Sequence, residues 1–181
     1  MNPSVHIYKK LNSFHGALAQ SFISASVKAQ QTGSFLSIVL PGGNTPRALF
    51  KYLSSPQIAQ KIKWPQLQFY WGDERCVPPY HPDSNFGMAQ KNLISRISLP
   101  AANIHRIFGE NDPYDEAIRY SMVIRSSIKS TLDSIPRLDW VLLGLGSDGH
   151  TASLFPGQVH KDLCGLAFHP ETGQRRITMT D

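Results

Sequence analysis

The sequence predicts an α/β fold in which helices cover both faces of a mostly parallel sheet. Apolar runs of strand length alternate with segments of helical periodicity along the chain, which is the pattern that such sheets produce. Three of these runs lead directly into a glycine-rich or charged loop, as strands do at the ligand-binding edge of open α/β sheets. No internal repeat, low-complexity stretch or flexible linker interrupts residues 1–181, so we expect one domain with enough chain to bury a sizeable core.

Composition narrows the range of partners and locations. The formal net charge of +5 favours anionic partners, but the basic residues are scattered and form no stripe interleaved with aromatic side chains. A small acidic metabolite therefore fits better than a nucleic acid. No stretch is apolar for long enough to span a membrane, and the start of the chain lacks the apolar core of a secretory signal. Cys76 and Cys164 form no CxxC pair, and we expect both to be free thiols in the cytoplasm.

The first helix is predicted to run from an N-cap at Ser13 to about Gln31, with Gly33 as its stop. Its apolar residues recur at helical spacing on one face, which would pack on the sheet. The next segment, Phe35 to Leu40, is a short apolar run typical of a buried strand.

The loop PGGNTP over 41–46 follows that strand directly. Thr45 as N-cap and Pro46 at the first helical position predict a helix over 47–53. Free backbone N–H groups at the start of a helix suit a phosphate group. The residues that would offer them are Gly42, Gly43, Asn44 and Thr45. Tight turns use the same residue types, so this loop alone leaves both interpretations open.

Charged residues follow the next strand-like run, Leu67 to Trp71, after a single glycine. Asp73 and Arg75 are two apart in an extended stretch and should point the same way. Arg75 would offer its planar fork to a phosphate, while Asp73 would accept from a sugar hydroxyl or hold Arg75 in place. The alternative is a surface ion pair, worth no more than about 1 kcal/mol.

The middle of the chain is predicted to form helices and a strand that support the fold. Asp83 or Ser84 should cap a helix that reaches about Ser95, and a short strand is expected over 104–108. Asp112 then caps a long helix with a proline at its start and acidic residues in its first turn. The buried face of that helix is predicted to comprise Ala117, Tyr120, Ile124, Ile128 and Leu132.

The stretch LDWVLLGLGSDGHTASLFPG combines a strand, a glycine loop and a histidine. The apolar run over 140–143 suits one buried parallel strand, and a glycine-rich turn follows over 144–149. Residues 151–155 are expected to form a short helical turn that a Pro-Gly pair ends. Asp148 and His150 stand at the end of the glycine turn. Histidine is the side chain best suited to exchange a proton near neutral pH, so His150 is the candidate general base.

Because the carboxyl ends of parallel strands meet at one edge, the three loops should share one site. Together they offer an anion cradle, a charged pair, and a histidine with a carboxylate two residues away. This set favours a phosphorylated small molecule and one general base. The G-x-S-x-G, P-loop and GxGxxG patterns are absent, which argues against serine hydrolases and nucleotide sites. No HExxH or Cys/His cluster occurs, so no metal is expected.

Three motifs, PGGNTP, WGDERCVPPYHPDSNFG and LLGLGSDGHTASLFPG, resemble those of 6-phosphogluconolactonases in order and spacing, over about residues 38–157. Glucosamine-6-phosphate deaminases are wider relatives that share the phosphate loop and the G-x-D-G-H element. The deaminases follow the histidine with a segment that ends in a glutamate, of the type FNEP, whereas this chain has TASLFP over 151–156. The resemblance is thus to the lactonase form, and it implies a Rossmann-like (NagB/RpiA-like) version of the α/β fold.

The resemblance implies hydrolysis of 6-phosphoglucono-1,5-lactone to 6-phosphogluconate in the oxidative pentose phosphate pathway, without metal or cofactor. His150 would take a proton from the water that attacks the lactone carbonyl, and Asp148 would orient the imidazole. The substrate, above all its phosphate, would be held by Gly42, Gly43, Asn44, Thr45 and Arg75.

The resembling proteins continue past the segment 175–180 for roughly another strand–helix–strand–helix portion. We therefore expect the 1–181 domain to lack the family's C-terminal portion. The family also carries a substrate-binding lysine shortly before that segment, and Arg175 or Arg176 would stand in for it here. Two alternative functions stay open: an aldose–ketose isomerase or deaminase of an amino sugar phosphate, and a non-catalytic phosphosugar-binding protein. The sequence does not predict an oligomeric state.

Overall fold

The structure, a computed structural model, describes residues 4–129, 131–132, 135–159 and 162–180. Its centre is a parallel sheet with the strand order β4–β2–β1–β7. The strands are β1 (Leu36–Leu40), β2 (Leu67–Trp71), β4 (Ile104–His105) and β7 (Trp140–Val141). β1 and β2 pair in register along their whole length, so both end at the same edge of the sheet.

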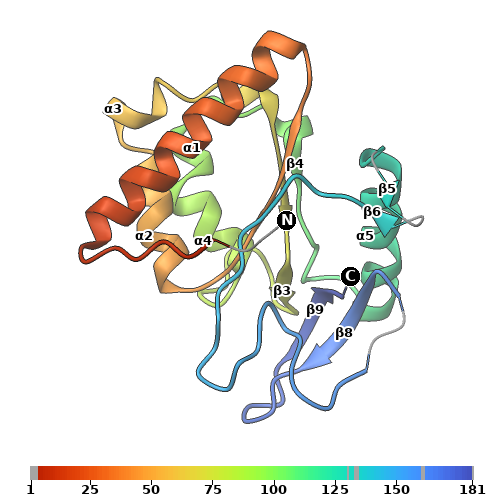
Figure 1. The fold of residues 1–181 in the computed structure, drawn as a ribbon. Coiled ribbons are helices and arrows are strands. Elements are labelled where there is room, and N and C mark those ends of the chain that lie inside the picture. The colour runs from red at the N-terminus through yellow and green to blue at the C-terminus, as the bar shows by residue number, and fades with distance from the viewer. Residues whose placement is uncertain (1–3, 130, 133–134, 160–161, 181) are drawn as a thin grey trace.

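Helices cover this sheet on both faces (Figure 1). α1 (Leu11–Thr32), α2 (Asn44–Leu53) and α4 (Asn85–Asn92) lie on one side, and α5 (Pro113–Ser127) lies on the other. A short helix, α3 (Pro56–Ala59), and 3-10 turns at 64–66, 94–96 and 101–103 complete the connections. The predicted α/β fold, with a parallel sheet between helical layers, is confirmed. None of the helices in the described part of the chain is apolar over a length that would cross a membrane.

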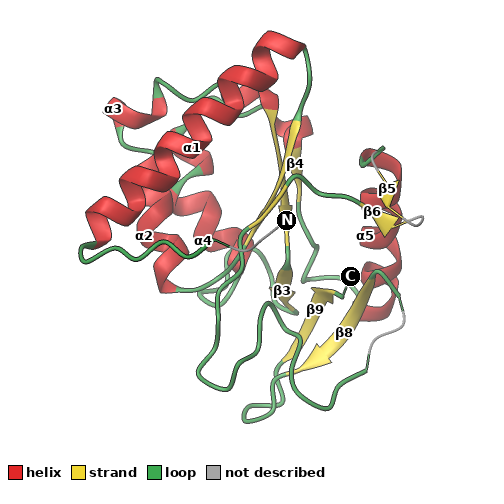
Figure 2. Cartoon of the chain, in the orientation of Figure 1, coloured by secondary structure: helices red, strands yellow, loops and turns green. Residues whose placement is uncertain are grey.

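A second, antiparallel sheet continues from the carboxyl end of β2 (Figure 2). It comprises β3 (Asp73–Arg75), β9 (Arg175–Met179) and β8 (Cys164–Phe168), with β9 in the middle. Gly72 joins the two sheets, because its N–H donates to the Leu40 carbonyl and its own carbonyl accepts from the Met179 N–H. The sequence predicted an extended stretch at 73–75 but not the sheet to which it belongs. A small hairpin of β5 (Thr131–Leu132) and β6 (Ile135–Pro136) follows α5.

Aromatic contacts fix the end of β2 between helices from the two layers. The Trp71 ring packs edge-on against Phe86 of α4, with 5.4 Å between ring centroids. From the other layer, the Tyr120 hydroxyl of α5 donates to the Trp71 carbonyl and accepts from the Trp71 N–H. Trp71 and Tyr120 are both fully buried. The charged residues that follow β2 therefore start from a rigid point.

The helix starts differ from the sequence-based prediction in two places. α1 begins at Leu11 with Lys10 as its N-cap, so Ser13 lies inside the first turn. α2 begins at Asn44 with Gly43 as its N-cap, so Thr45 is not the cap. The Gly43 φ of 100° lets the chain enter the helix early. A proline in the first turn is tolerated because N–H groups there have no helical acceptor.

Other elements are shorter than predicted. α4 ends at Asn92, and a 3-10 turn completes the stretch toward Ser95. The strands expected over 104–108 and 140–143 shrink to two residues each, β4 and β7. α5 ends at Ser127 because Ile128 adopts extended backbone, so Leu132 lies in β5 instead of on the helix. Of the two caps predicted for α4, Asp83 or Ser84, it is Ser84 that caps the helix, and the predicted cap of α5, Asp112, is confirmed; both form side-chain hydrogen bonds.

Residues 151–155 form a tight turn, not the predicted helical one. The Leu154 N–H donates to the Thr151 carbonyl, and Ala152 has a φ of 49°. The Ser153 N–H donates to the Thr178 hydroxyl of β9 instead of to a carbonyl of a helix. A hydrogen bond to β9 of the second sheet thus takes the place of a hydrogen bond within a helical turn.

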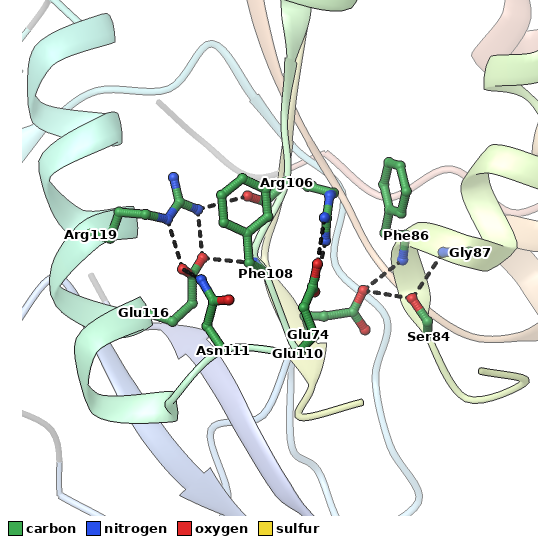
Figure 3. A network of polar contacts seen from close by, with 10 residues as sticks. All are labelled: Glu74, Ser84, Phe86, Gly87, Arg106, Phe108, Glu110, Asn111, Glu116 and Arg119. Carbon is green, nitrogen blue, oxygen red and sulfur yellow. Dashed lines mark hydrogen bonds and ion pairs between the residues drawn. The ribbon is translucent and has the colours of Figure 1, made fainter. Parts of the chain in front are cut away.

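Glu74 attaches β3 to the start of α4 (Figure 3). Its buried carboxylate accepts from the backbone N–H groups of Arg75, Asn85 and Phe86 and from the Ser84 hydroxyl, at 2.7–3.1 Å. The carboxylate thereby caps the positive end of the helix dipole. Burial nevertheless raises the pKa of this carboxyl, so the donors offset only part of the cost of burying it. The residues on either side of Glu74 are held in place by this anchor.

Glu74→Gln should lower the free energy of unfolding by about 1–3 kcal/mol, because the amide nitrogen would face donors that then lack an acceptor. Urea denaturation followed by circular dichroism measures this change. Glu110→Gln is the matched control, since Glu110 forms a partly exposed ion pair with Arg106 that is worth no more than about 1 kcal/mol. Equal losses in both variants would contradict the anchoring role of Glu74.

Candidate functional site

The predicted loops meet in a cleft of about 320 Å³ at the carboxyl ends of β1, β2 and β7. Every candidate residue from the sequence except Asp148 lines the cleft: Gly42, Gly43, Asn44, Thr45, Asp73, Arg75 and His150. Asp148 adjoins it through a hydrogen bond to His150. Arg176 of β9 completes the lining together with 144–146 and Ala152. The juxtaposition expected from the sheet topology is therefore present.

The loop before α2 presents the N-terminus of that helix to the cleft. Asn44 and Thr45 lie in its first turn, where backbone N–H groups have no preceding helical carbonyl to bond. Gly42 is required by close packing, because a Cβ there would lie 2.0 Å from Asn85 Oδ1. Gly43 is required by its positive φ. The loop is thus a fixed set of donors of the kind that binds phosphate.

Asp73 is almost fully buried and held from two sides. Its Oδ1 accepts from Asn85 Nδ2 at 3.0 Å, and its Oδ2 accepts from the Ser153 hydroxyl at 2.7 Å. The ion pair with Arg75 that the sequence left open does not form within the described residues. The Arg75 guanidinium donates to the carbonyl of Asp83 instead. Asp73 is therefore positioned by α4 and by the turn after His150. Sequence reasoning missed both of these partners.

Arg75 and Arg176 stand directly opposite each other in the β3–β9 pair, and both line the cleft. Like charges at directly opposite positions destabilise an antiparallel pair, so the stability of the sheet does not account for them. The Nε atom of each is buried without a hydrogen-bond partner among the described residues. An anion bound between the two guanidinium groups would supply acceptors and offset the repulsion.

Arg176 is the more deeply buried of the two, at 8% exposed, with its guanidinium carbon 5.5 Å from the centroid of the Phe155 ring. Burial lowers its pKa, the charge of Arg75 lowers it further, and Asp73 acts in the opposite direction. Arg175, one residue earlier, is exposed and lies outside the cleft. The sequence named Arg175 or Arg176 as a candidate substrate contact, and of the two only Arg176 lines the cleft. Because side chains alternate between the two faces of a strand, only one of two neighbouring arginines can face the cleft. The sequence did not show which one, because the pairing of β9 with β3 was not known.

His150 and Asp148 form the candidate base. Their Nδ1 and Oδ1 atoms are 2.5 Å apart, and the His150 backbone N–H donates to the same oxygen. Hydrogen bonds from the ring and the backbone of His150 hold the pKa of the Asp148 carboxyl below its usual range. An ionised carboxylate accepts from Nδ1–H, which leaves the lone pair of the neutral imidazole on Nε2. The ring also packs against Phe155, with 4.7 Å between centroids. A ring fixed in this way suits a general base.

Gly146→Ala should lower kcat by about 10²-fold with little loss of stability, because a Cβ at Gly146 would lie 2.3 Å from Nδ1 and Cε1 of the His150 ring. The ring must move away from its productive position, whereas the backbone is unaffected. Steady-state kinetics and thermal unfolding measure the two effects. Gly16→Ala in α1 is the control, since its Cβ meets only an ordinary contact with Tyr52. Unchanged kcat in Gly146→Ala would show that the ring position is not critical.

Within the described part of the chain, no group of His, Cys, Asp and Glu side chains has an arrangement that could hold a metal ion. The cleft offers a histidine hydrogen-bonded to a carboxylate, two guanidinium groups and a helix N-terminus. This set is suited to binding an anionic substrate and moving one proton at a time near it.

Comparisons with known proteins agree on one family. The family model described as glucosamine-6-phosphate isomerases/6-phosphogluconolactonase matches residues 10–181. A 6-phosphogluconolactonase of Haemophilus influenzae is 45% identical over 166 residues, which are 90% of this chain and 68% of the relative. A 6-phosphogluconolactonase of Treponema pallidum is 35% identical over 168 residues, 91% of this chain and 69% of the relative. The crystal structure of a protein named devB has a TM-score of 0.90 at 45% identity, over 96% of this chain and 72% of that one.

Proposed function

The chain belongs to the glucosamine-6-phosphate isomerase/6-phosphogluconolactonase family, and we propose that it hydrolyses 6-phosphoglucono-1,5-lactone to 6-phosphogluconate. Relatives at 35% and 45% identity are 6-phosphogluconolactonases, which supports a lactone hydrolase of the oxidative pentose phosphate pathway. The observation that carries the proposal is that the His150–Asp148 pair and the Arg75–Arg176 pair meet at one cleft. One pair activates water, and the other holds the phosphate.

In the first step, Nε2 of His150 takes a proton from a water molecule as its oxygen bonds to the lactone carbonyl carbon. A tetrahedral intermediate forms, and its oxygen carries the negative charge. The ring C–O bond then breaks, and the imidazolium returns the proton to the departing alkoxide, which becomes the hydroxyl of the open chain. The ionised Asp148 carboxylate orients the ring and stabilises the imidazolium between the two steps.

Substrate binding is assigned to the groups on β3, β9 and α2. The phosphate lies between the guanidinium groups of Arg75 and Arg176, whose buried Nε atoms need acceptors. The first-turn N–H groups of α2, in the loop with Gly42, Gly43, Asn44 and Thr45, add donors to the same anion or to the sugar. Asp73 accepts from a sugar hydroxyl at the cleft wall. Positioning of this kind suffices for an activated lactone, which opens slowly without an enzyme.

In this role residues 1–181 act as one sugar-phosphate-binding domain whose partner is a small phosphosugar lactone, without nucleic acid. We place the protein in the cytoplasm, where its thiols stay reduced. Both cysteines are free, and burial raises the pKa of each thiol to about 11, so neither is a reactive nucleophile.

The direct test is the rate of lactone disappearance with the purified 1–181 protein beside a blank without protein. Turnover above the blank is expected, with no ammonia released from glucosamine 6-phosphate, because no glutamate follows His150 in the segment 151–156. Ammonia release would favour the deaminase function. Binding of 6-phosphogluconate without turnover, by a protein that circular dichroism shows to be folded, would favour a non-catalytic phosphosugar-binding protein and overturn the proposal.

A further inference from the structure

A second pocket, of about 520 Å³, lies between α2, α4 and the loop 79–82. We call it the basic pocket. It shares α2 with the cleft, since 44–46 line the cleft whereas Arg47 and Lys51 line the basic pocket. Lys91 of α4 is the third permanent cation in its lining. The candidate active site uses none of these three side chains.

The charges of the basic pocket are all of one sign. Its lining contains no acidic side chain, and α2, α4 and the loop 77–82 contain none in their sequences. Arg47, Lys51 and Lys91 form no ion pair within the described residues. Arg47 and Lys51 are four apart on one helix, which is an unfavourable spacing for like charges. Arg47 also lies in the N-terminal half of α2, where the helix dipole disfavours a cation. Lys51 and Lys91, in contrast, stand in the last turns of α2 and α4, where the helix dipole favours a cation. Helix stability therefore leaves Arg47 and its spacing to Lys51 unaccounted for, and a bound anion would relieve the repulsion within the cluster.

The loop wall of the basic pocket is well fixed. The carbonyl of Pro79 lies 2.2 Å from where a Cβ of Gly87 would be, so the loop packs directly on the backbone of α4. His81 Nδ1 accepts from the Asp83 N–H at 3.1 Å, and the neutral ring therefore carries its proton on Nε2, as one more donor. The carboxylate of Asp83 accepts from Gln174 of the β8–β9 turn. Tyr80 lines the pocket as well and is 87% exposed.

We propose that the basic pocket binds a polyphosphate group, meaning two or more linked phosphates. Three unpaired cations around one cavity match an anion of several charges better than a single phosphate. The volume lies within the range of small-molecule sites. The exposed Tyr80 ring and the prolines beside it give a base ring a surface to stack on, so a nucleotide and an inorganic polyphosphate are the two sources of this chemistry. The proposal does not depend on the lactonase activity.

Calorimetric titration of the 1–181 protein with inorganic tripolyphosphate tests the proposal. The double variant Lys51→Gln/Lys91→Gln should weaken binding by about tenfold or more. Lys28→Gln/Lys61→Gln removes the same charge from exposed helix and loop positions outside the pocket, and should leave the affinity unchanged. In an Arg176→Gln background, which removes one of the proposed phosphate contacts of the cleft, Lys51→Gln/Lys91→Gln should cause the same loss of affinity, which separates the basic pocket from the cleft. No binding at millimolar ligand, or an equal loss in the control pair, would overturn the proposal.

ATP titrated in the same way distinguishes the two sources. If a nucleotide is the ligand, ATP should bind more tightly than tripolyphosphate, and Tyr80→Ala should remove that difference. Equal affinities for ATP and tripolyphosphate, both lost in Lys51→Gln/Lys91→Gln, would identify inorganic polyphosphate. An affinity for ATP that only Arg176→Gln weakens would place the nucleotide in the cleft and contradict the proposal.

Discussion

Replacing His150 with alanine should lower kcat for lactone hydrolysis by about 10²–10⁴-fold, while the affinity for 6-phosphogluconate changes little. In the proposed mechanism His150 Nε2 supplies the lone pair that takes the proton from water, and the ring contacts Asp148 and Phe155. The groups that we propose to bind the phosphate lie on other elements. Initial rates corrected for spontaneous opening measure kcat, and calorimetry measures binding of the product.

His169→Ala is the matched control for this variant. The His169 ring packs against the same Phe155 ring, with 5.3 Å between centroids, but it does not line the cleft. Its removal should leave kcat near that of the unmodified protein. Turnover well above the blank in His150→Ala, or an equal loss in His169→Ala, would contradict the role of His150 as the base.

The pH dependence of kcat is a second test of the His150–Asp148 pair. Turnover should fall as the pH is lowered, because a protonated imidazole cannot accept a proton from water. Asp148 should not contribute to this limb until more acidic pH, because its hydrogen bonds to His150 hold the pKa of its carboxyl below the usual range. A flat profile across the acid limb would argue against a histidine base.

Features fixed by local sequence could be predicted. β2 begins and ends where its apolar run does. The glycine loops before α2 and before His150 depend on the backbone conformation of single residues, such as the positive φ of Gly43. The meeting of the three loops followed from topology, because parallel strands that alternate with helices end at one edge. Caps with side-chain acceptors are also local: Asp112 was predicted correctly, and Ser84 was one of the two residues predicted to cap α4.

Features set by distant partners could not be predicted. Ser153 bonds Asp73 across 80 positions, and this contact goes with a tight turn where a helical turn was expected. The choice between Arg175 and Arg176 depends on how β9 pairs with β3, because alternation shows that one of them faces the cleft but not which one. The sequence assigned no role to Glu74, which is an anchor for the start of α4 because its partners lie 11 and 12 positions away.

Arg75→Gln and Arg176→Gln should each raise KM by about 10- to 100-fold with kcat nearly unchanged, because each removes a charge-assisted contact that the substrate and the transition state share. The two arginines are paired across strands at a cost to the sheet, and their buried Nε atoms have no acceptor among the described residues, which a bound anion would supply. Calorimetry with 6-phosphogluconate should show the same loss of affinity. Arg176→Lys should restore only part of it, since an ammonium keeps the charge but not the planar fork.

Arg175→Gln separates this local effect from the general attraction of a basic protein for an anion. It removes the same charge one residue away, from an exposed position outside the cleft. If KM rises only in the Arg75 and Arg176 variants, the phosphate lies between the two strands. A comparable rise in Arg175→Gln would show that long-range charge is sufficient, and the phosphate would then be assigned to the loop before α2. Because Arg175 and Arg176 differ in which side of β9 they occupy, the comparison tests the strand register as well as the binding site.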